Sequence, residues 1–475
     1  MLFNSLEFAL FFPIVTGVYY LLRHRGQNLW LLAASLFFYA SWDWRFLPIL
    51  ATTMVVDFYV AAYLEELAKS GAPERKRKLV LAISMGSNLA MLGFFKYFNF
   101  FADSLHSGLL ALHIPAPIST LNILLPIGIS FYTFQSMSYT IDVYRGELPA
   151  AKHFLDFALF VSFYPHLVAG PIMRAVDLLP QIESPRHASR QQILDGIQLI
   201  VWGLWKKMFI ADNLAPVVNR IFAETAPSGF HTLIGVYAFA FQIYCDFSGY
   251  TDVARGVAKL MGFELVLNFN LPYFATSPQD FWTRWHISLS SWLRNYLYFP
   301  LGGSRDGTAK TYRNLMITML LGGLWHGAAW NFVLWGAYQG MLLVIHRALQ
   351  PTLDKIFTAR TAGARAVSLT VRILVMFQLT CFGWLLFRAT SFNQIVTMTA
   401  SLFHPFQQID LNFVWQVTGY VAPLVAVQCW QYFSGKLIFL AHLRPLEIRV
   451  AAYSVLLYLM LFRAAKPQAF IYFQF

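Results

Sequence analysis

Charged residues are scarce in this chain. Only 12% of its 475 residues are charged and 57% are hydrophobic, whereas soluble domains carry roughly 25% charged residues. The mean hydropathy is +0.52. This deficit of charge excludes an ordinary soluble protein. It predicts an all-α polytopic membrane protein, built as one transmembrane domain over residues 1–475.

Recognisable soluble-enzyme signatures are also missing. The sequence has no Walker loop, no GxGxxG fingerprint and no GxSxG elbow, so nucleotide-binding and serine-hydrolase chemistry find no support. The three cysteines, Cys245, Cys381 and Cys429, lie in apolar stretches without metal-ligand or disulfide spacing. We therefore expect inert buried thiols, no bound metal and no bound cofactor.

The excess of positive charge has a simple explanation. The net charge is +12, but the basic residues fall in short loops between apolar runs, which is typical of membrane topology rather than of nucleic-acid binding. Arg23 and Arg25, and the basic segment Lys69–Lys78, should be cytoplasmic. The turn Ser41–Trp44 then faces outward. The N-terminus is predicted to be extracytoplasmic, and Phe8–Leu22 to be a retained first span rather than a cleaved signal peptide.

Apolar runs recur along the whole chain. A membrane-spanning helix takes about 20 apolar residues, so we expect roughly ten to twelve spans, with the shorter runs re-entrant or interfacial. We divide the chain into N-terminal helices (1–230), a core that carries two histidines (231–347), and C-terminal helices with an aromatic tail (348–475). The runs cover residues 8–22, 29–41, 46–63, 79–95, 98–112, 121–141, 154–172, 192–211, 232–251, 314–345, 368–387, 391–403, 412–432 and 447–463.

The stretch 252–313 is different in character. It is polar and aromatic and is interrupted by Pro272, Pro278 and Pro300. Irregular backbone at membrane depth survives only inside protein or around a water-filled cavity. We therefore expect short re-entrant helices, with turns at Asn268–Leu271 and Gly302–Gly307.

His326 is the most informative residue. It stands in Gly322–Asn331, within an almost uncharged apolar run, and intramembrane ionisable residues are costly and usually face a cavity or a partner. A neutral imidazole there can take a proton from an attacking hydroxyl and return it to a leaving thiolate. Trp325 and Asn331 are candidate supporting residues. The alternative is a core histidine bonded to a backbone carbonyl.

His286 is the second candidate, 40 residues before His326. On a helix it would share a face with Trp282, four residues earlier. It would orient His326, or hold the acceptor or the thioester carbonyl. Spacing alone favours an interfacial histidine in an aromatic belt.

Carboxylates at membrane depth also need partners. Asp246 and Asp252 would orient an imidazole or pair with Arg255 or Arg284, and we favour the ion pair. Asp57, Asn88 and Lys96, in the early helices, are expected to make polar contacts between helices.

The chain stops on an aromatic hexapeptide, Phe470–Phe475. Polypeptide ends are usually polar and frayed, so this tail is expected to dock in a groove. Tyr472 would then offer a phenol near the site. On sequence alone, a packing plug is the better interpretation.

Six segments together resemble the membrane-bound O-acyltransferase family. The segments fit best with the bacterial branch, whose members serve alginate, cellulose and peptidoglycan O-acetylation and teichoic-acid D-alanylation. Within that branch, the likeness is strongest to the alginate group. The segments are Leu124–Tyr132, Tyr139–Gly146, Pro165–Pro171, Asp246–Asp252, Arg284–Ser290 and Leu321–Gly327.

The resemblance implies a ring of helices around a funnel or tunnel with both histidines near its constriction. His326 matches the invariant family histidine and His286 the second histidine of the bacterial branch. A cytoplasmic thioester, acetyl-CoA or an acyl-carrier thioester, would donate an acetyl group to an exported polysaccharide. The tail is similar to an aromatic-tyrosine motif of this branch, which raises Tyr472 as a transient acyl acceptor.

The resemblance also implies a cellular location and partner proteins, and it leaves other acceptors and other functions open. The expected location is the bacterial inner membrane, and the expected partners are an extracytoplasmic acyltransferase and polysaccharide export machinery. A basic cytoplasmic mouth would attract the anionic donor, with Arg294, Arg305, Lys310 and Arg313 as candidates. Peptidoglycan, cellulose or teichoic acid remain alternative acceptors. A transporter or flippase for a lipid-linked saccharide and a non-catalytic scaffold remain alternative functions.

Overall fold

The computed structural model describes residues 1–475 except 115–119, 169, 359–360, 441–442 and 472–475. The described residues are helical and contain no strand. They form two compact units, one of residues 1–197 with 254–266 and one of residues 198–253 with 267–475. The helical fold class is confirmed, and the organisation as one domain stays a prediction.

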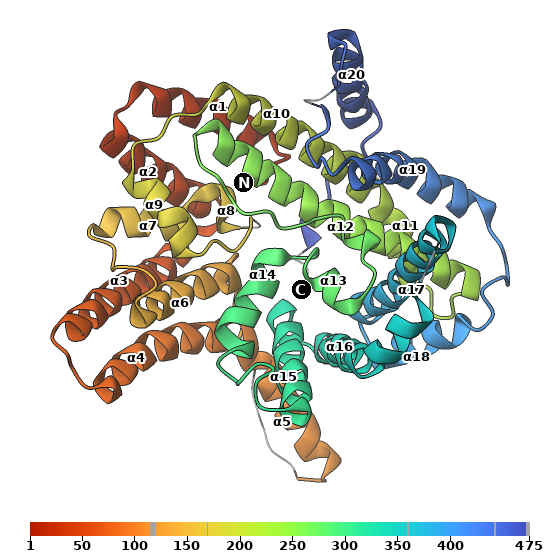
Figure 1. Cartoon of the computed structure of the whole chain (residues 1–475), viewed down its shortest axis with the longest axis horizontal. Coiled ribbons are helices and arrows are strands. Elements are labelled where there is room, and N and C mark those ends of the chain that lie inside the picture. The colour runs from red at the N-terminus through yellow and green to blue at the C-terminus, as the bar shows by residue number, and fades with distance from the viewer. Residues whose placement is uncertain (115–119, 169, 359–360, 441–442, 472–475) are drawn as a thin grey trace. The chain divides into compact units, whose positions relative to one another are not determined.

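The first unit contains the early helices (Figure 1). α10 (Arg190–Trp205) runs from this unit into the second, and α12 (Gly229–Leu260) returns to it. The other elements are α1 (Leu6–Leu21), α2 (His24–Asp43), the 3₁₀ turn η1 (Trp44–Phe46), α3 (Leu47–Lys69), α4 (Glu74–Leu92), the π-helical turn η2 (Gly93–Tyr97), α5 (Phe98–Ala111), α6 (Ile129–Arg145), α7 (Phe154–Ser162), α8 (Tyr164–Leu167) and α9 (Ala175–Glu183).

The second unit contains the later helices. Its elements are the π-helical turn η3 (Lys206–Ala211), α11 (Asp212–Phe222), the 3₁₀ turn η4 (Pro272–Phe274), α13 (Pro278–Trp282), α14 (Ile287–Leu293), the π-helical turn η5 (Arg294–Tyr298), α15 (Thr308–His326), α16 (Trp330–Ile356), α17 (Ala362–Arg388), α18 (Phe392–Ser401), α19 (Leu411–Ser434) and α20 (Leu446–Phe462).

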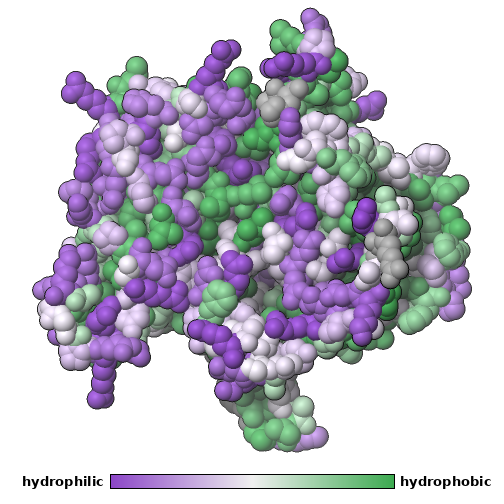
Figure 2. All heavy atoms as spheres, viewed as in Figure 1, coloured by the Kyte–Doolittle hydropathy of each residue, from purple (hydrophilic) through white to green (hydrophobic). Residues whose placement is uncertain are grey.

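Four helical segments are long and apolar enough to cross a membrane: His24–Lys69, Glu74–Ala111, Trp330–Ile356 and Ala362–Arg388. Large apolar side chains also lie on the surface, as on α5, where Phe101, Leu105 and Leu110 are exposed. Figure 2 shows broad hydrophobic areas beside hydrophilic ones on the face in view. Such surface requires lipid rather than water around it. The chain is a multi-pass membrane protein, and the number of ten to twelve spans stays a prediction.

Three sequence expectations about helix limits differ from the structure. The run 314–345 is two helices, because α15 ends at His326 and α16 begins at Trp330. The run 121–141 becomes helical only at Ile129, after Gly128 with φ 74°. The segment Ser41–Trp44 is not an open turn, because α2 passes through η1 into α3, with the Asp43 carboxylate accepting from the Arg45 backbone amide at 3.0 Å.

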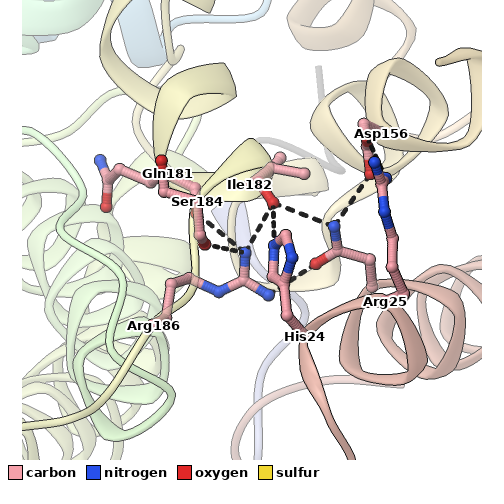
Figure 3. Close-up of polar contacts among 8 residues, drawn as sticks. His24, Arg25, Asp156, Gln181, Ile182, Ser184 and Arg186 are labelled. Carbon is pink, nitrogen blue, oxygen red and sulfur yellow. Dashed lines mark hydrogen bonds and ion pairs between the residues drawn. The ribbon is translucent and has the colours of Figure 1, made fainter. Parts of the chain in front are cut away.

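A buried polar cluster fixes the segment after α9 against α2 in the first unit (Figure 3). The Arg186 guanidinium donates to the carbonyls of Gln181 and Ile182, each at 2.8 Å, and to Asn28 Oδ1 at 2.6 Å. Asn28 in turn donates to Asp156 Oδ1 at 2.9 Å. Every member has a partner, so the cluster stabilises the unit without offering a binding site.

Candidate active site

The end of α15 places His326. The next residue, Gly327, is extended and ends the helix, and His326 is 5% exposed. α15 and α16 meet through glycines: a Cβ on Gly323 would lie 2.2 Å from the Phe332 carbonyl oxygen, and one on Gly336 would lie 2.4 Å from that of Met319. Only glycine fits at such a contact. The small residues that the sequence shows around His326 therefore serve close helix packing.

Aromatic rings enclose the His326 imidazole. The ring centroid of Trp335 lies 5.1 Å away with an interplanar angle of 88°, and that of Phe387 lies 5.4 Å away at 77°. Trp325 contacts His326 at 5.2 Å. Edge-to-face contacts of this kind are favourable and directional. They fix the plane of the imidazole and surround it with apolar groups.

His286 lies in a break between helices. It is completely buried and stands at the N-terminal cap of α14 with φ 43° and ψ 54°, in the left-handed region. The expected shared helix face with Trp282 is wrong, because α13 ends at Trp282 and does not continue into His286. A non-glycine residue in this conformation costs on the order of 1–3 kcal/mol and persists only where its surroundings enforce it.

Asn268 is the group that holds His286. Its Oδ1 lies 3.2 Å from His286 Nδ1 and accepts from the Ser288 backbone amide at 3.2 Å and the Ser288 hydroxyl at 3.0 Å. An amide oxygen only accepts, so the network assigns the proton of the neutral imidazole to Nδ1 and the lone pair to Nε2. Asn268 therefore fixes both the ring and its tautomer.

The two histidines are neighbours. Their ring centroids lie 6.4 Å apart with an interplanar angle of 62°. Trp325 lies beside both, with its centroid 5.8 Å from that of His286. Residues 40 positions apart in the sequence thus converge within the second unit.

A cavity of about 410 Å³ opens beside His326. Its walls come from α14, η5, α15 and α16, and they include His326, Trp335 and Ser290. Arg294 and Arg347 also line it. A mainly apolar pocket with a few polar groups is the usual form of a small-molecule site.

The four basic residues suggested by the sequence for a cytoplasmic mouth differ in their relation to this cavity. Arg294 lines the cavity as expected, whereas Arg305, Lys310 and Arg313 are not among the described residues of its wall. Lys310 lies 3.7 Å from Asp306, and the Arg313 guanidinium donates to Asn314 Oδ1. Arg347, on α16, supplies the second cation.

Asn331 and Asp246 take supporting positions. The Asn331 amide donates to the Phe387 carbonyl at 3.1 Å, which joins the start of α16 to the end of α17 beside His326. Asp246 is buried and pairs with the Lys207 ammonium at 2.7 Å, while the same ammonium lies 2.8 Å from Asp212. The expected pairing of Asp246 with Arg255 or Arg284 is wrong, because a buried lysine lies closer.

Arg284 pairs with Asp280 at 2.6 Å, one turn away, and Lys206 is a partner of Asp252 at 2.8 Å. No group of three or more His, Cys, Asp or Glu side chains among the described residues could hold a metal.

The C-terminal tail docks on α12. The Ile471 amide donates to Asp246 Oδ2 at 2.6 Å, and the Gln468 carbonyl accepts from Lys207 at 3.0 Å. The Phe470 ring lies 5.9 Å from that of Phe247, which contacts His286 at 4.7 Å. Of the predicted tail, Phe470 and Ile471 are described, and both contact α12; docking of the whole tail in a groove stays a prediction. Tyr472 lies outside the described residues.

Comparison with known proteins decides the family. Residues 145–387 match the profile of MBOAT, the membrane-bound O-acyltransferase family. That range contains both histidines, Asn268 and the cavity. The chain belongs to this family.

Its relatives are bacterial. It is 43% identical over 404 residues to a protein of Azotobacter vinelandii named "Probable alginate O-acetylase AlgI", a match that covers 85% of this chain and 78% of the relative. A protein of the same name from Pseudomonas putida is 42% identical over 450 residues, covering 94% and 89%. The peptidoglycan O-acetyltransferase of Helicobacter pylori is 36% identical over 423 residues, covering 82% and 77%. The expectation of a membrane-bound O-acyltransferase is confirmed.

Sequence reasoning missed three residues of this acyltransferase. Asn268 was read only as part of a turn, although an asparagine between aromatic residues in a buried segment signals a hydrogen-bonding role. Lys207 stands in an apolar run, where an ionisable residue needs an explanation. Trp335 carries no such signal, because nothing in the sequence shows which face of α16 meets His326.

Proposed function

We propose that this O-acyltransferase moves an acetyl group from a cytoplasmic thioester donor to an exported polysaccharide of the alginate type. The observation that carries the proposal is the convergence of His286 and His326 beside a cavity. The relatives named for alginate O-acetylation favour that acceptor. The donor is acetyl-CoA or an acyl-carrier thioester.

His326 acts as the general base. It takes the proton of the attacking hydroxyl as the oxygen bonds to the thioester carbonyl carbon, and it returns that proton to the thiolate as the carbon–sulfur bond breaks. Help of this kind contributes about 10²–10⁴ in rate. His286 supports this step through its unprotonated Nε2, whose direction Asn268 sets. Trp325, which lies beside both rings, excludes water from them.

The cavity receives the acyl end of the donor. Its apolar wall accommodates a thioester arm, and Arg294 and Arg347 supply positive charge for an anionic donor. Since a bulky, charged coenzyme does not cross the bilayer, only the acetyl group passes the constriction between the histidines.

The tail supplies an acyl acceptor in this proposal. Ile471 is held by Asp246, and Tyr472 follows it in the sequence. Its phenol would accept the acetyl group before the group leaves the membrane. We expect Tyr472→Phe to lower acetyl transfer to the polymer at least tenfold while the protein remains folded. Transfer at the wild-type rate would mean that the tail only packs.

Membership of the family supports a proposal for the wider architecture. We propose a single domain of ten to twelve spans around a tunnel, located in the bacterial inner membrane with its N-terminus extracytoplasmic. The partners are an extracytoplasmic acyltransferase and the polysaccharide export machinery. If the protein were a transporter, it would move saccharide without consuming acetyl-CoA. If it were a scaffold, substitution of a histidine would disrupt assembly of the complex rather than acyl transfer.

Peptidoglycan is the second candidate acceptor, because the H. pylori relative is named for it and matches most of the chain. Cellulose and teichoic acid are further alternatives within the branch.

The test uses the purified protein in lipid nanodiscs with labelled acetyl-CoA and either alginate oligosaccharides or muramyl peptides. We expect transfer by the wild type and a loss of about 10²–10⁴-fold in His326→Ala. His346→Ala, which changes a histidine elsewhere on the second unit, is the matched control and should keep wild-type activity. Normal transfer in His326→Ala would reject the assignment, and transfer only to muramyl peptides would change the acceptor.

A further inference from the structure

A second cavity lies between α16 and α17 in the second unit (Figure 1). It measures about 420 Å³, which is within the range of about 300–1,000 Å³ that small-molecule sites occupy. Both helices are long and apolar enough to cross a membrane, and the chain turns back between them within residues 357–361. The mechanism proposed above does not use this cavity.

One wall of the cavity is apolar and open to the outside of the protein. Ile345 and Leu349, on α16, are 53% and 49% exposed, and Val375, on α17, is 53% exposed. Apolar side chains on the surface of a membrane-spanning helix face lipid. A hydrocarbon chain can therefore enter the cavity sideways from the bilayer.

The other wall carries two opposite charges, Arg372 and Asp354. Arg372 lies ten residues inside α17, which is about 15 Å along the helix. Its guanidinium carbon nevertheless lies 5.9 Å from the ring centroid of Phe357, just beyond the end of α16. Long basic side chains reach in this way toward the membrane surface. The charged head therefore lies near the level of lipid head groups.

The contacts of Arg372 leave room for an anion. Its guanidinium donates to the Thr276 carbonyl at 3.4 Å and to the Thr276 hydroxyl at 3.5 Å, and both partners are neutral. Among the residues that the structure describes, Arg372 has no ion pair with a carboxylate and Asp354 has none with a cation. A guanidinium offers five N–H donors, and an ionisable group in a membrane span usually faces a cavity or a partner.

We propose that this cavity binds one membrane phospholipid with an amine-bearing, zwitterionic head group, of the phosphatidylethanolamine class. The lipid phosphate accepts hydrogen bonds from Arg372, since a guanidinium matches phosphate geometry. The ammonium pairs with Asp354. One acyl chain lies along Ile345, Leu349 and Val375, and the second chain stays in the bilayer. A head group with a phosphate alone would place a second negative charge beside Asp354.

The rival occupant is the acyl donor. Gln279 lines both this cavity and the one beside His326, and acetyl-CoA also carries phosphates. It has no hydrocarbon chain to cover the open apolar wall, however, and no ammonium to pair with Asp354. The lipid site does not rest on the proposed acyl transfer, and either can fail without the other.

The test measures saturable binding of three radiolabelled lipids to the full chain in detergent micelles. They are phosphatidylethanolamine, phosphatidylglycerol, which has the phosphate without the ammonium, and diacylglycerol, which has neither. We expect one phosphatidylethanolamine per chain, weaker binding of phosphatidylglycerol and no saturable binding of diacylglycerol. Arg372→Gln should weaken phosphatidylethanolamine affinity at least tenfold. The control Arg365→Gln, which removes an exposed charge from the same helix, should keep the wild-type affinity.

Asp354→Asn is a second test that holds even if Arg372→Gln does not fold, because Asp354 is exposed. We expect this variant to bind the two phospholipids equally, and a persistent preference for phosphatidylethanolamine would reject the head-group assignment. Saturable binding of diacylglycerol, or full affinity in Arg372→Gln, would show that the phosphate is not recognised. Displacement of the lipid by acetyl-CoA would assign the cavity to the donor instead.

Discussion

His286 shows how one residue of the site depends on its surroundings. Its left-handed backbone conformation is unfavourable for histidine. The Asn268 carbonyl oxygen, which binds the imidazole and both donors of Ser288, enforces it. Asn268 is therefore a positioning residue, since its effect on the reaction passes through the His286 ring.

Substitution of Asn268 should show whether this residue orients the His286 ring for the reaction or only packs in the protein interior. We expect Asn268→Ala to lower kcat about 10–100-fold with little change in KM, because the ring loses its orientation and tautomer but the donor cavity is intact. Steady-state kinetics with acetyl-CoA measure both constants. Asn268→Asp, which retains an acceptor oxygen, should recover part of the rate. Asn270→Ala is the control, and an equal loss there would contradict the account.

The residue types of the site were readable from the sequence, but their geometry was not. His286 and His326 stood out because imidazoles in apolar segments need a function. Asp246 stood out for the same reason, but its partner Lys207 could not be identified, because the pairing depends on how η3 packs against α12. The rings around His326 come from α15, α16 and α17, and only the tertiary structure brings them together.

At the scale of elements, the crossing of α15 and α16 decides where His326 lies. The sequence indicated one long apolar run here, and the break at residues 327–329 could not be seen in hydropathy alone. The break turns the chain back, and the glycine contacts bring Trp335 against the imidazole. The close packing of these two helices is thus a condition for the site.

A methyl group at that crossing should therefore be costly. We expect Gly336→Ala to destabilise the protein by about 1–3 kcal/mol or more, because the new Cβ meets the Met319 carbonyl at 2.4 Å. Gly419→Ala, on α19, meets nothing within 4 Å and should be neutral or slightly stabilising. Thermal unfolding in detergent compares the two. Equal stability of both variants would show that the crossing is not tight.

At the scale of the whole molecule, hydropathy predicted the class and the helical fold, and the basic loops predicted the orientation. Hydropathy does not determine the number of spans as directly. Among the described residues, four helical segments are by themselves long and apolar enough to cross a membrane, which is fewer than the ten to twelve spans predicted. Helices such as α7 and α8 are short and buried, since they pack inside protein rather than facing lipid. Apolar content alone does not distinguish these two surroundings.

The orientation can be tested with two matched cysteines on one helical segment. Ser41 and Ser70 are both exposed, and they flank η1 and α3. In a background without Cys245, Cys381 and Cys429, we expect a membrane-impermeant maleimide to label Ser41→Cys in intact spheroplasts. Ser70→Cys should react only after lysis, because the basic segment beside it is cytoplasmic. The reverse pattern would invert the topology.

The most direct test of the account is the double substitution of the two histidines. Single-turnover transfer from labelled acetyl-CoA is measured for His326→Ala, His286→Ala and the two together. Residues that act as one unit have strongly non-additive effects. We predict that the double variant is no slower than His326→Ala alone, whereas rate losses that multiply would show that the two imidazoles do not serve one site.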